Sequence, residues 1–148
     1  MELKEIGTEV SLEKFGELYL VSSYVDLRSR RTFYIADNRD EALKAFKFEI
    51  AYSLYEIGLE NETEREICEK ILEKYGFLED MKDAYRILEE NEGRVSLSSF
   101  PDTMRRKYPH LDLDLILIAL SALETKKYVN FVFDKGESFW ISTKKIDF

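Results

Sequence analysis

Few side chains in this sequence have the types and spacing that catalysis or metal binding requires. His110 is the only histidine, and it follows Pro109 in what looks like a turn, without a neighbour that would hold it as a general base. Cys68 is the only cysteine, and its isoleucine neighbours favour core packing over reactivity. One histidine and one cysteine cannot supply the usual ligands of a zinc site. We therefore expect a protein that is not an enzyme, with no metal and no cofactor.

Four glutamates recur at helical spacing and are the one pattern that resembles a carboxylate metal site: Glu62, Glu66, Glu69 and Glu73. Sites of that kind usually add a histidine in a Glu-x-x-His pair, and the sequence has none here. Lys70 and Lys74 alternate with the glutamates, which predicts a solvated helix face laced with ion pairs. No glycine-rich phosphate loop is present either. A small carboxylate-dependent enzyme remains only a minor alternative.

Composition limits the class of protein. The chain has 148 residues, 45% of them hydrophobic, which is enough for a core in one domain or two very small ones. No apolar run approaches the roughly 18 residues of a membrane span. The first residues lack the pattern of a signal peptide, and a single cysteine is typical of a cytoplasmic protein. A chain with no glutamine and 35% charged residues resembles proteins of hyperthermophiles, with an archaeal-like composition.

Charge is unevenly distributed along the chain. Residues 1–81 contain 11 basic and 19 acidic residues, whereas residues 82–148 contain 11 of each. The net charge of -8 therefore comes from the first half. Binding of nucleic acid usually requires a basic surface, which only the second half can provide, and only if its charges separate onto different faces.

The first half, residues 1–78, predicts an acidic region made of a β-hairpin followed by helices. Residues 18–27 and 32–36 have the aromatic and β-branched composition of strands, joined by a tip with Arg28, Arg30 and Arg31. Asn38 and Asn61 are expected N-caps of the next two helices, because each is followed three residues later by a glutamate. Gly58 and Gly76 are the expected stops.

The helix expected at residues 39–57 carries two apolar stripes. Leu43, Phe46, Ile50, Leu54 and Ile57 form one, and a second, on a different side, includes Phe48, Tyr52 and Tyr55. A surface helix normally has a single stripe facing the core. The second stripe therefore needs its own cover, which is either another part of the chain or a second copy, and we expect a homodimer or a protein partner.

The second half, residues 79–148, contains a helix at 81–90, the strand-like RVSL at 94–97, a short helix with Pro101 in its first turn, a leucine-rich helix capped by Asp112 or Asp114, and a hairpin at 129–142. This order, together with the run LSALETKKYVNFV where the leucine-rich helix passes into the hairpin, resembles the winged-helix (winged helix-turn-helix) superfamily. The expected fold class is thus α+β: an N-terminal hairpin with helices, then a winged-helix-like domain. The wing turn is expected at Asp134–Glu137.

The resemblance implies DNA binding, with the third helix in the major groove and the wing on the phosphate backbone. The third helix departs from that pattern, because its front carries Asp112 and Asp114 instead of groups that read base edges. Leu115, Leu117 and Ile118 fall outside its expected core stripe. Bare apolar residues at this place are more typical of a protein interface.

Basic residues in the second half are the candidate nucleic-acid contacts. They are Arg105, Arg106, Lys107, Lys126, Lys127, Lys135, Lys144 and Lys145. They either form one band that contacts phosphates or are scattered over a solvated surface. We expect a non-enzymatic winged-helix-type protein of nucleic-acid metabolism that is associated with transcription regulation. It is expected to act as a dimer or docked on a protein partner, and to make weak contacts to the DNA backbone. The alternative is a protein-interaction adaptor that does not bind DNA.

Overall fold

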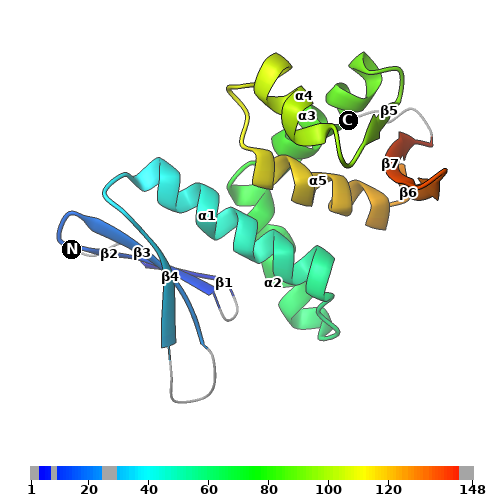
Figure 1. The fold of residues 1–148 in the computed structure, drawn as a ribbon. Helices are drawn as coiled ribbons and strands as arrows, with labels where there is room; N and C mark the ends of the chain where they lie inside the picture. The colour runs from blue at the N-terminus through cyan, green and yellow to red at the C-terminus, as the bar shows by residue number, and fades with distance from the viewer. Residues whose placement is uncertain (1–3, 8–9, 25–29, 144–148) are drawn as a thin grey trace. The chain divides into compact units, whose positions relative to one another are not determined.

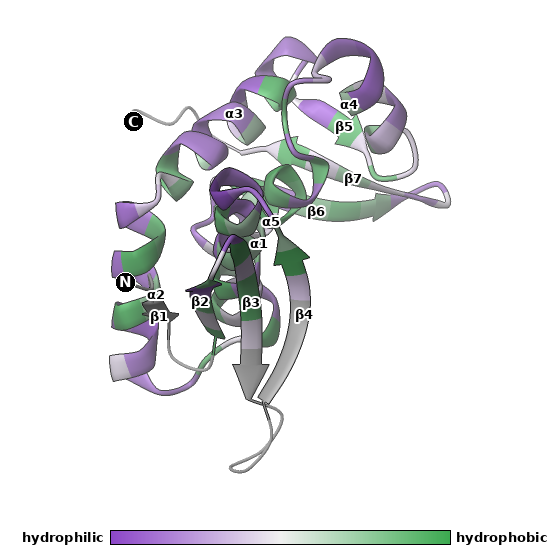
Figure 2. Ribbon diagram, turned by 90° about the vertical axis from the view of Figure 1, so that its left-hand side faces the viewer, coloured by the Kyte–Doolittle hydropathy of each residue, from purple (hydrophilic) through white to green (hydrophobic). Residues whose placement is uncertain are grey.

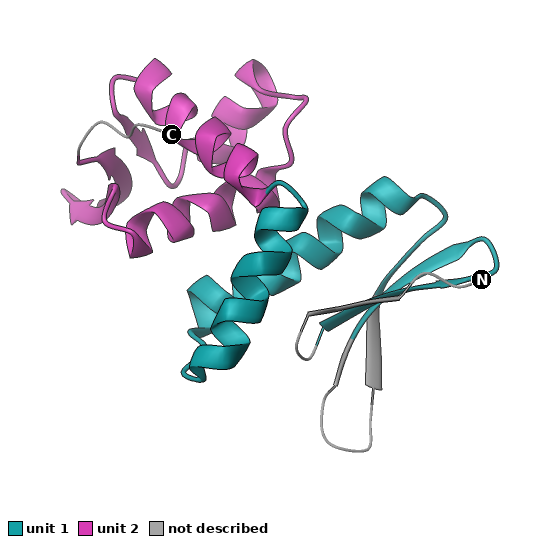
Figure 3. Cartoon of the chain, turned by 180° about the vertical axis from the view of Figure 1, so that it is seen from behind, with its two compact units in different colours: residues 1–76 teal, residues 77–148 magenta. Residues whose placement is uncertain are grey.

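The computed structural model describes residues 4–7, 10–24 and 30–143, with the side chains of residues 10–22 and 34–143. The chain divides into two compact units, Met1–Gly76 and Phe77–Phe148 (Figure 3). The division lies close to the boundary expected after residue 78, and the expected α+β class is confirmed. None of the described helices is long and apolar enough to cross a membrane.

Unit 1 begins with an antiparallel sheet in the order β1-β2-β3-β4 (Figure 1). The expected hairpin is confirmed as β3 (Leu18–Tyr24) and β4 (Arg30–Ala36). Two further strands, β1 (Lys4–Gly7) and β2 (Val10–Phe15), were not expected from the sequence. In β2 the apolar alternation is short and is interrupted by charged residues, yet Val10 and Leu12 are buried. Residues 10–15 therefore form a strand because they pair with the longer β3, and not because of their composition.

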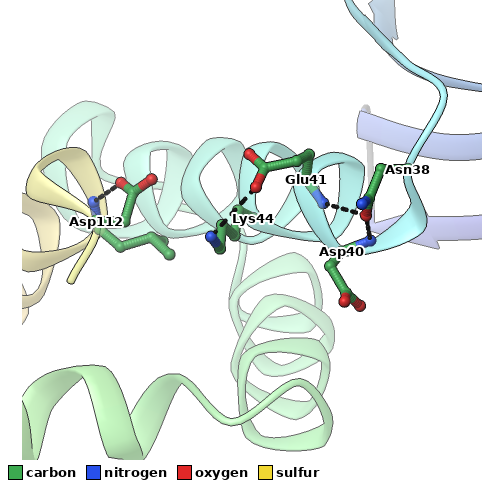
Figure 4. A network of polar contacts seen from close by, with 6 residues as sticks. Asn38, Asp40, Glu41, Lys44 and Asp112 are labelled. Atoms are coloured by element: carbon green, nitrogen blue, oxygen red, sulfur yellow. Dashed lines mark hydrogen bonds and ion pairs between the residues drawn. The ribbon is translucent and has the colours of Figure 1, made fainter. Parts of the chain in front are cut away.

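Helix α1 (Arg39–Tyr52) packs on β2, β3 and β4 and against α2. Asn38 is its N-cap, as expected, and accepts hydrogen bonds from the backbone N–H groups of Asp40 and Glu41 (Figure 4). Phe46, Ile50 and Leu54 of the first stripe are buried.

The end of the first stripe differs from the expectation, because Ile57 is 67% exposed. The helix does not continue as an α-helix to this residue. It ends in a π-helical turn, η1 (Ser53–Ile57), followed by Gly58 in the left-handed conformation. A π-helical turn has more residues than an α-helical one, so Ile57 is rotated away from the stripe that an α-helix would have continued.

Helix α2 (Glu62–Lys74) completes unit 1. Asn61 caps it by accepting a hydrogen bond from Glu64 N–H at 3.0 Å. Cys68 and Leu72 are buried on its inner side, which confirms the packing role expected for the cysteine. Glu62, Glu66, Glu69 and Glu73 are all exposed, as expected for a solvated face.

Unit 2 has the element order expected from the resemblance. It contains α3 (Phe77–Glu90), β5 (Arg94–Ser96), α4 (Phe100–Lys107), α5 (Leu113–Thr125), β6 (Val129–Asp134) and β7 (Glu137–Ser142). The strands form an antiparallel sheet in the order β5-β7-β6 (Figure 1). Helices α4 and α5 stand where the resemblance predicts a helix-turn-helix pair, and β6 and β7 form the hairpin expected as the wing.

The core of unit 2 lies around α5, which packs against α3 and β6. Ile116, Leu120 and Leu123 of α5 are almost fully buried. On the sheet, Val95, Val129 and Trp140 are buried on one face, and they belong to three neighbouring strands. The apolar colouring of α5 and β6 in Figure 2 reflects this distribution. The core therefore holds the wing strands and the third helix in a fixed relation within unit 2.

Candidate nucleic-acid interface and partner surfaces

The third helix, α5, contains no lysine or arginine that could contact DNA. Asp112 is its N-cap and accepts a hydrogen bond from Leu115 N–H at 3.0 Å (Figure 4). From Leu113 to Thr125 the exposed residues are Asp114, Glu124 and Thr125. Two of these are carboxylates, which phosphates repel. The exposed side of α5 is thus acidic and poor in donors for base edges.

The expectation that the front of α5 is left bare is wrong for two of its three residues. Leu115 and Ile118 are only 4% and 3% exposed, and Leu117 is half-buried. Seven of the 13 residues of α5 are buried. A helix that is apolar on all sides is typical of an interior helix, so the extra apolar residues indicate burial on more than one side and not a free surface.

Six of the eight basic candidates are described, and all six are exposed. Lys144 and Lys145 lie outside the described residues, as does Arg28 of the first-half cluster, and the side chains of Arg30 and Arg31 are likewise outside them. On the last turn of α4, Arg105 pairs with Asp102 at 2.9 Å and Lys107 donates to Asn91 Oδ1 at 3.0 Å. Exposure keeps all of these groups accessible to a phosphate.

Hydrogen bonds link the last turn of α4 to the end of α5. Asn91, which binds Lys107, lies two residues before Gly93, whose carbonyl accepts from Ser142 N–H at 2.9 Å. The next residue, Thr143, donates its hydroxyl to the Lys127 carbonyl at 2.9 Å. The last turn of α4 and the end of α5, which together carry five basic residues, are thus connected through one end of the β5-β7-β6 sheet, and exposed Glu90, Glu92 and Glu124 lie on the same or the linking segments. We call the five basic residues the basic end: Arg105, Arg106, Lys107, Lys126 and Lys127.

Lys135 lies at the other end of the same sheet. The expected wing is confirmed, with Asp134 paired to Glu137 and Val129 paired to Ser142. Lys135 and Gly136 both have positive φ, +51° and +84°, as a type I′ turn requires. A strand of six residues spans about 20 Å. The length of β6 therefore separates Lys135 from Lys126 and Lys127, and the six described candidates do not form one continuous band.

Near the wing tip the local charges are mixed. Asp134 and Glu137 flank the turn, and Ser98 donates a hydrogen bond to Glu137 Oε1 at 2.8 Å. The single lysine at this end is therefore outnumbered by two carboxylates, which makes the wing tip a weak site for phosphate.

A row of aromatic rings on the core face of the wing was missed by the sequence reasoning. Phe100 contacts Trp140 with ring centroids 5.5 Å apart, and Trp140 contacts Phe131 at 5.0 Å. Phe131 is 39% exposed and Phe133, further along β6, is 75% exposed. The signal was present in the alternation of VNFVFD, which places Phe131 and Phe133 on one face together with the buried Val129.

The second stripe of α1 is partly exposed, as the sequence predicted. Phe48 and Tyr52 have ring centroids 5.9 Å apart, and Tyr52 is 41% exposed. Tyr55 is half-buried, and burial, with a smaller contribution from the charge of Glu69, raises its pKa to about 12. These three residues remain candidates for contact with a partner.

Within the described residues, no group of three or more histidine, cysteine, aspartate or glutamate side chains is arranged to hold a metal ion. Glu62, Glu66 and Glu69 line an open surface depression together with Glu60 and Arg65. His110 is exposed, in the segment between α4 and α5.

The fold defines an α+β protein of two units, with an N-terminal antiparallel sheet and a C-terminal antiparallel hairpin sheet. Comparison with protein-family models, with curated proteins and with solved structures gives no match.

Proposed function

We propose that this chain is a non-enzymatic, winged-helix-type protein of nucleic-acid metabolism, associated with transcription in the cytoplasm, that contacts the DNA backbone through the basic end of unit 2. The observation that carries the proposal is the exposure of five basic side chains on the last turn of α4 and the end of α5, two segments that hydrogen bonds connect through one end of the β5-β7-β6 sheet. Each lysine or arginine that meets a phosphate releases condensed counterions, which favours binding.

The proposed contact is one of charge and not of sequence. Helix α5 offers no arginine, lysine, asparagine or glutamine to base edges. Lys107 and Arg105 make exposed polar contacts within the protein, and such contacts contribute little to stability. Both side chains can therefore exchange these contacts for phosphate at small cost.

Charge reversal at the two ends of the sheet tests this proposal. Fluorescence anisotropy of a labelled DNA duplex is measured with the triple variant Arg105→Glu, Arg106→Glu, Lys107→Glu, with each of these three changes alone, and with Lys135→Glu, which matches each single change in charge. The triple variant is expected to weaken binding by at least about tenfold, since three phosphate contacts are lost. The control at the wing tip is expected to change affinity by about threefold or less, as a lone charge does. Equal losses in the triple variant and in Lys135→Glu would contradict the assignment to the basic end.

A second candidate function is a protein-interaction adaptor that keeps the winged-helix-like fold without binding DNA. The observation that favours it is the acidic exposed side of α5, where Asp114 and Glu124 replace the basic residues of a groove-reading helix. The same anisotropy experiment separates the two candidates. Absence of DNA binding at low salt, where backbone contacts are strongest, would support the adaptor.

A further inference from the structure

Strand β6 is the open edge of the wing sheet. It is the last strand in the order β5-β7-β6, and no other described strand pairs with its outer side. An open edge presents unpaired backbone N–H and C=O groups that can add a further strand. The question is which strand fits this edge.

The hydrogen bonds of β7 establish which residues of β6 point outward. Ser138 and Ser142 direct their backbone groups to the β5 side, where they bond Leu97 and Gly93. Because bonding directions alternate along a strand, Glu137, Phe139 and Ile141 face β6 and bond their partners Asp134, Val132 and Asn130. The backbone groups of the remaining β6 residues, Val129, Phe131 and Phe133, therefore point to the open edge.

This edge lacks the features that usually prevent edge pairing. From Val129 to Phe133 it has no proline, no lysine and no other charged residue, and its pairing with β7 has no bulge. Its only charge is Asp134, at the turn. Phe131 and Phe133 are exposed beside it. An aromatic edge without such protection indicates a surface that is covered in the working protein.

We propose that the edge is covered by β6 of a second copy of this chain, paired antiparallel about a two-fold axis at Val132. In this register Phe131 lies opposite the partner's Phe133, and these residues are the ones whose backbone groups point outward, so each pair exchanges two hydrogen bonds. Asn130 lies opposite the partner's Asp134, where the amide can donate to the carboxylate. No like charges face each other. The two sheets become one sheet of six strands.

The aromatic row supports a second copy over an unrelated peptide. The row Phe100, Trp140, Phe131 stops at the open edge, where Phe131 is 39% exposed. The partner's Phe133 stands directly opposite Phe131 and on the same face, so it extends the row across the edge. Directly opposed aromatic rings are favourable cross-strand pairs. The strand is thus complementary to itself in backbone, charge and side-chain shape, as a two-fold interface requires.

The test uses the two-fold axis. Val132 faces its own copy, so Val132→Lys and Val132→Glu each place like charges opposite each other. Sedimentation of the full wild-type chain is expected to give twice the 17.5 kDa of one chain. Each variant alone is expected to dimerise about a hundredfold more weakly. An equimolar mixture of the two is expected to restore a dimer, because lysine then faces glutamate.

Controls distinguish this edge from other surfaces. Tyr52→Glu adds a carboxylate to the exposed stripe of α1 and is expected to leave the dimer intact. Phe133→Pro removes an N–H that points to the open edge and leaves the bonds between β6 and β7 in place, so it is expected to give a monomer even if the Val132 variants fail to fold. A monomeric wild-type chain, a dimer that survives Val132→Lys, a folded pair of Val132 variants that do not associate, or dissociation by Tyr52→Glu would each overturn the proposal. The proposal does not depend on DNA binding.

Discussion

Two residues of this protein are restricted by their surroundings: Gly93 by its backbone conformation and Tyr55 by partial burial of its phenol. Gly93 has a φ of +77° and lies where its carbonyl binds Ser142 N–H, at the junction of α3 with the wing sheet. Tyr55 is half-buried in η1, the π-helical turn that follows α1, beside the charge of Glu69 on α2. Each of these residues gives a measurable prediction.

We predict that Gly93→Ala destabilises unit 2 by about 1–2 kcal/mol in denaturant unfolding, mainly through its positive φ, with a smaller cost from rotation of the Ser142 hydroxyl away from the new Cβ atom. A Cβ atom at this position would lie 2.8 Å from Ser142 Oγ, and the positive φ adds strain. Gly136→Ala is the matched control, because Gly136 has a φ of +84° with no atom within 4 Å of an added Cβ. It is expected to cost only about 1 kcal/mol. Equal losses in both variants would show that the close approach to Ser142 does not matter.

We predict that Tyr55 makes the protein less stable in strong alkali. Its pKa is raised from 10.0 to about 12, mainly by burial, so the unfolded chain loses the phenolic proton first. The contribution is fully present below pH 10 and is lost as the pH rises towards about 12. Solvent screening of a half-buried group reduces the loss to about 1–2 kcal/mol. Unfolding of wild type and Tyr55→Phe across this range measures it, and an unchanged pH profile in Tyr55→Phe would contradict the assignment.

At the scale of elements, caps and turns are what the local sequence encodes best. Asn38, Asn61 and Asp112 are N-caps in the structure, each accepting a backbone N–H. The type I′ turn at Lys135 and Gly136 fixes the register of β6 on β7. That register determines which residues of β6 point to the open edge, so a local turn controls the candidate dimer interface.

We predict that Asp112→Ala lowers the free energy of unfolding by about 1 kcal/mol, because the backbone N–H of Leu115 loses its acceptor. Asp112→Asn keeps an acceptor at the same position and is expected to lower the free energy of unfolding by only about 0.3 kcal/mol. Chemical denaturation of the three proteins checks the order. A loss in Asp112→Asn as large as in Asp112→Ala would indicate that the charge at the helix start, and not the hydrogen bond, stabilises α5.

At the scale of the whole molecule, charge determines how the protein meets nucleic acid. The excess of acidic residues lies in residues 1–81, and the basic end lies in unit 2. The acidic first half repels DNA beyond the range of direct contact, more so at low salt. The proposed contact therefore uses a small surface of a protein with a net charge of -8.

We predict weak DNA binding that depends on salt and shows little preference among sequences. If all five residues of the basic end meet phosphates, the logarithm of the binding constant falls with the logarithm of salt concentration with a slope of at most about -4.5. The triple charge reversal on α4 should reduce this slope by about 3. Anisotropy titrations at several salt concentrations with unrelated duplexes provide the measurement. Tight, sequence-selective binding at high salt would show that α5 reads bases after all.

The sequence by itself determined the helix caps, the wing hairpin and the element order of unit 2, because these depend on contacts within a few residues. It did not predict β1 and β2, because charged residues interrupt the short apolar alternation of β2 and only pairing with β3 establishes it as a strand, nor the exposure of Ile57, which follows from a π-helical turn. Only the tertiary structure showed that Leu115 and Ile118 are buried and that Lys135 is a strand's length from Lys126 and Lys127. Burial and the gathering of charges depend on which elements meet in space, and residue types along the chain do not specify this.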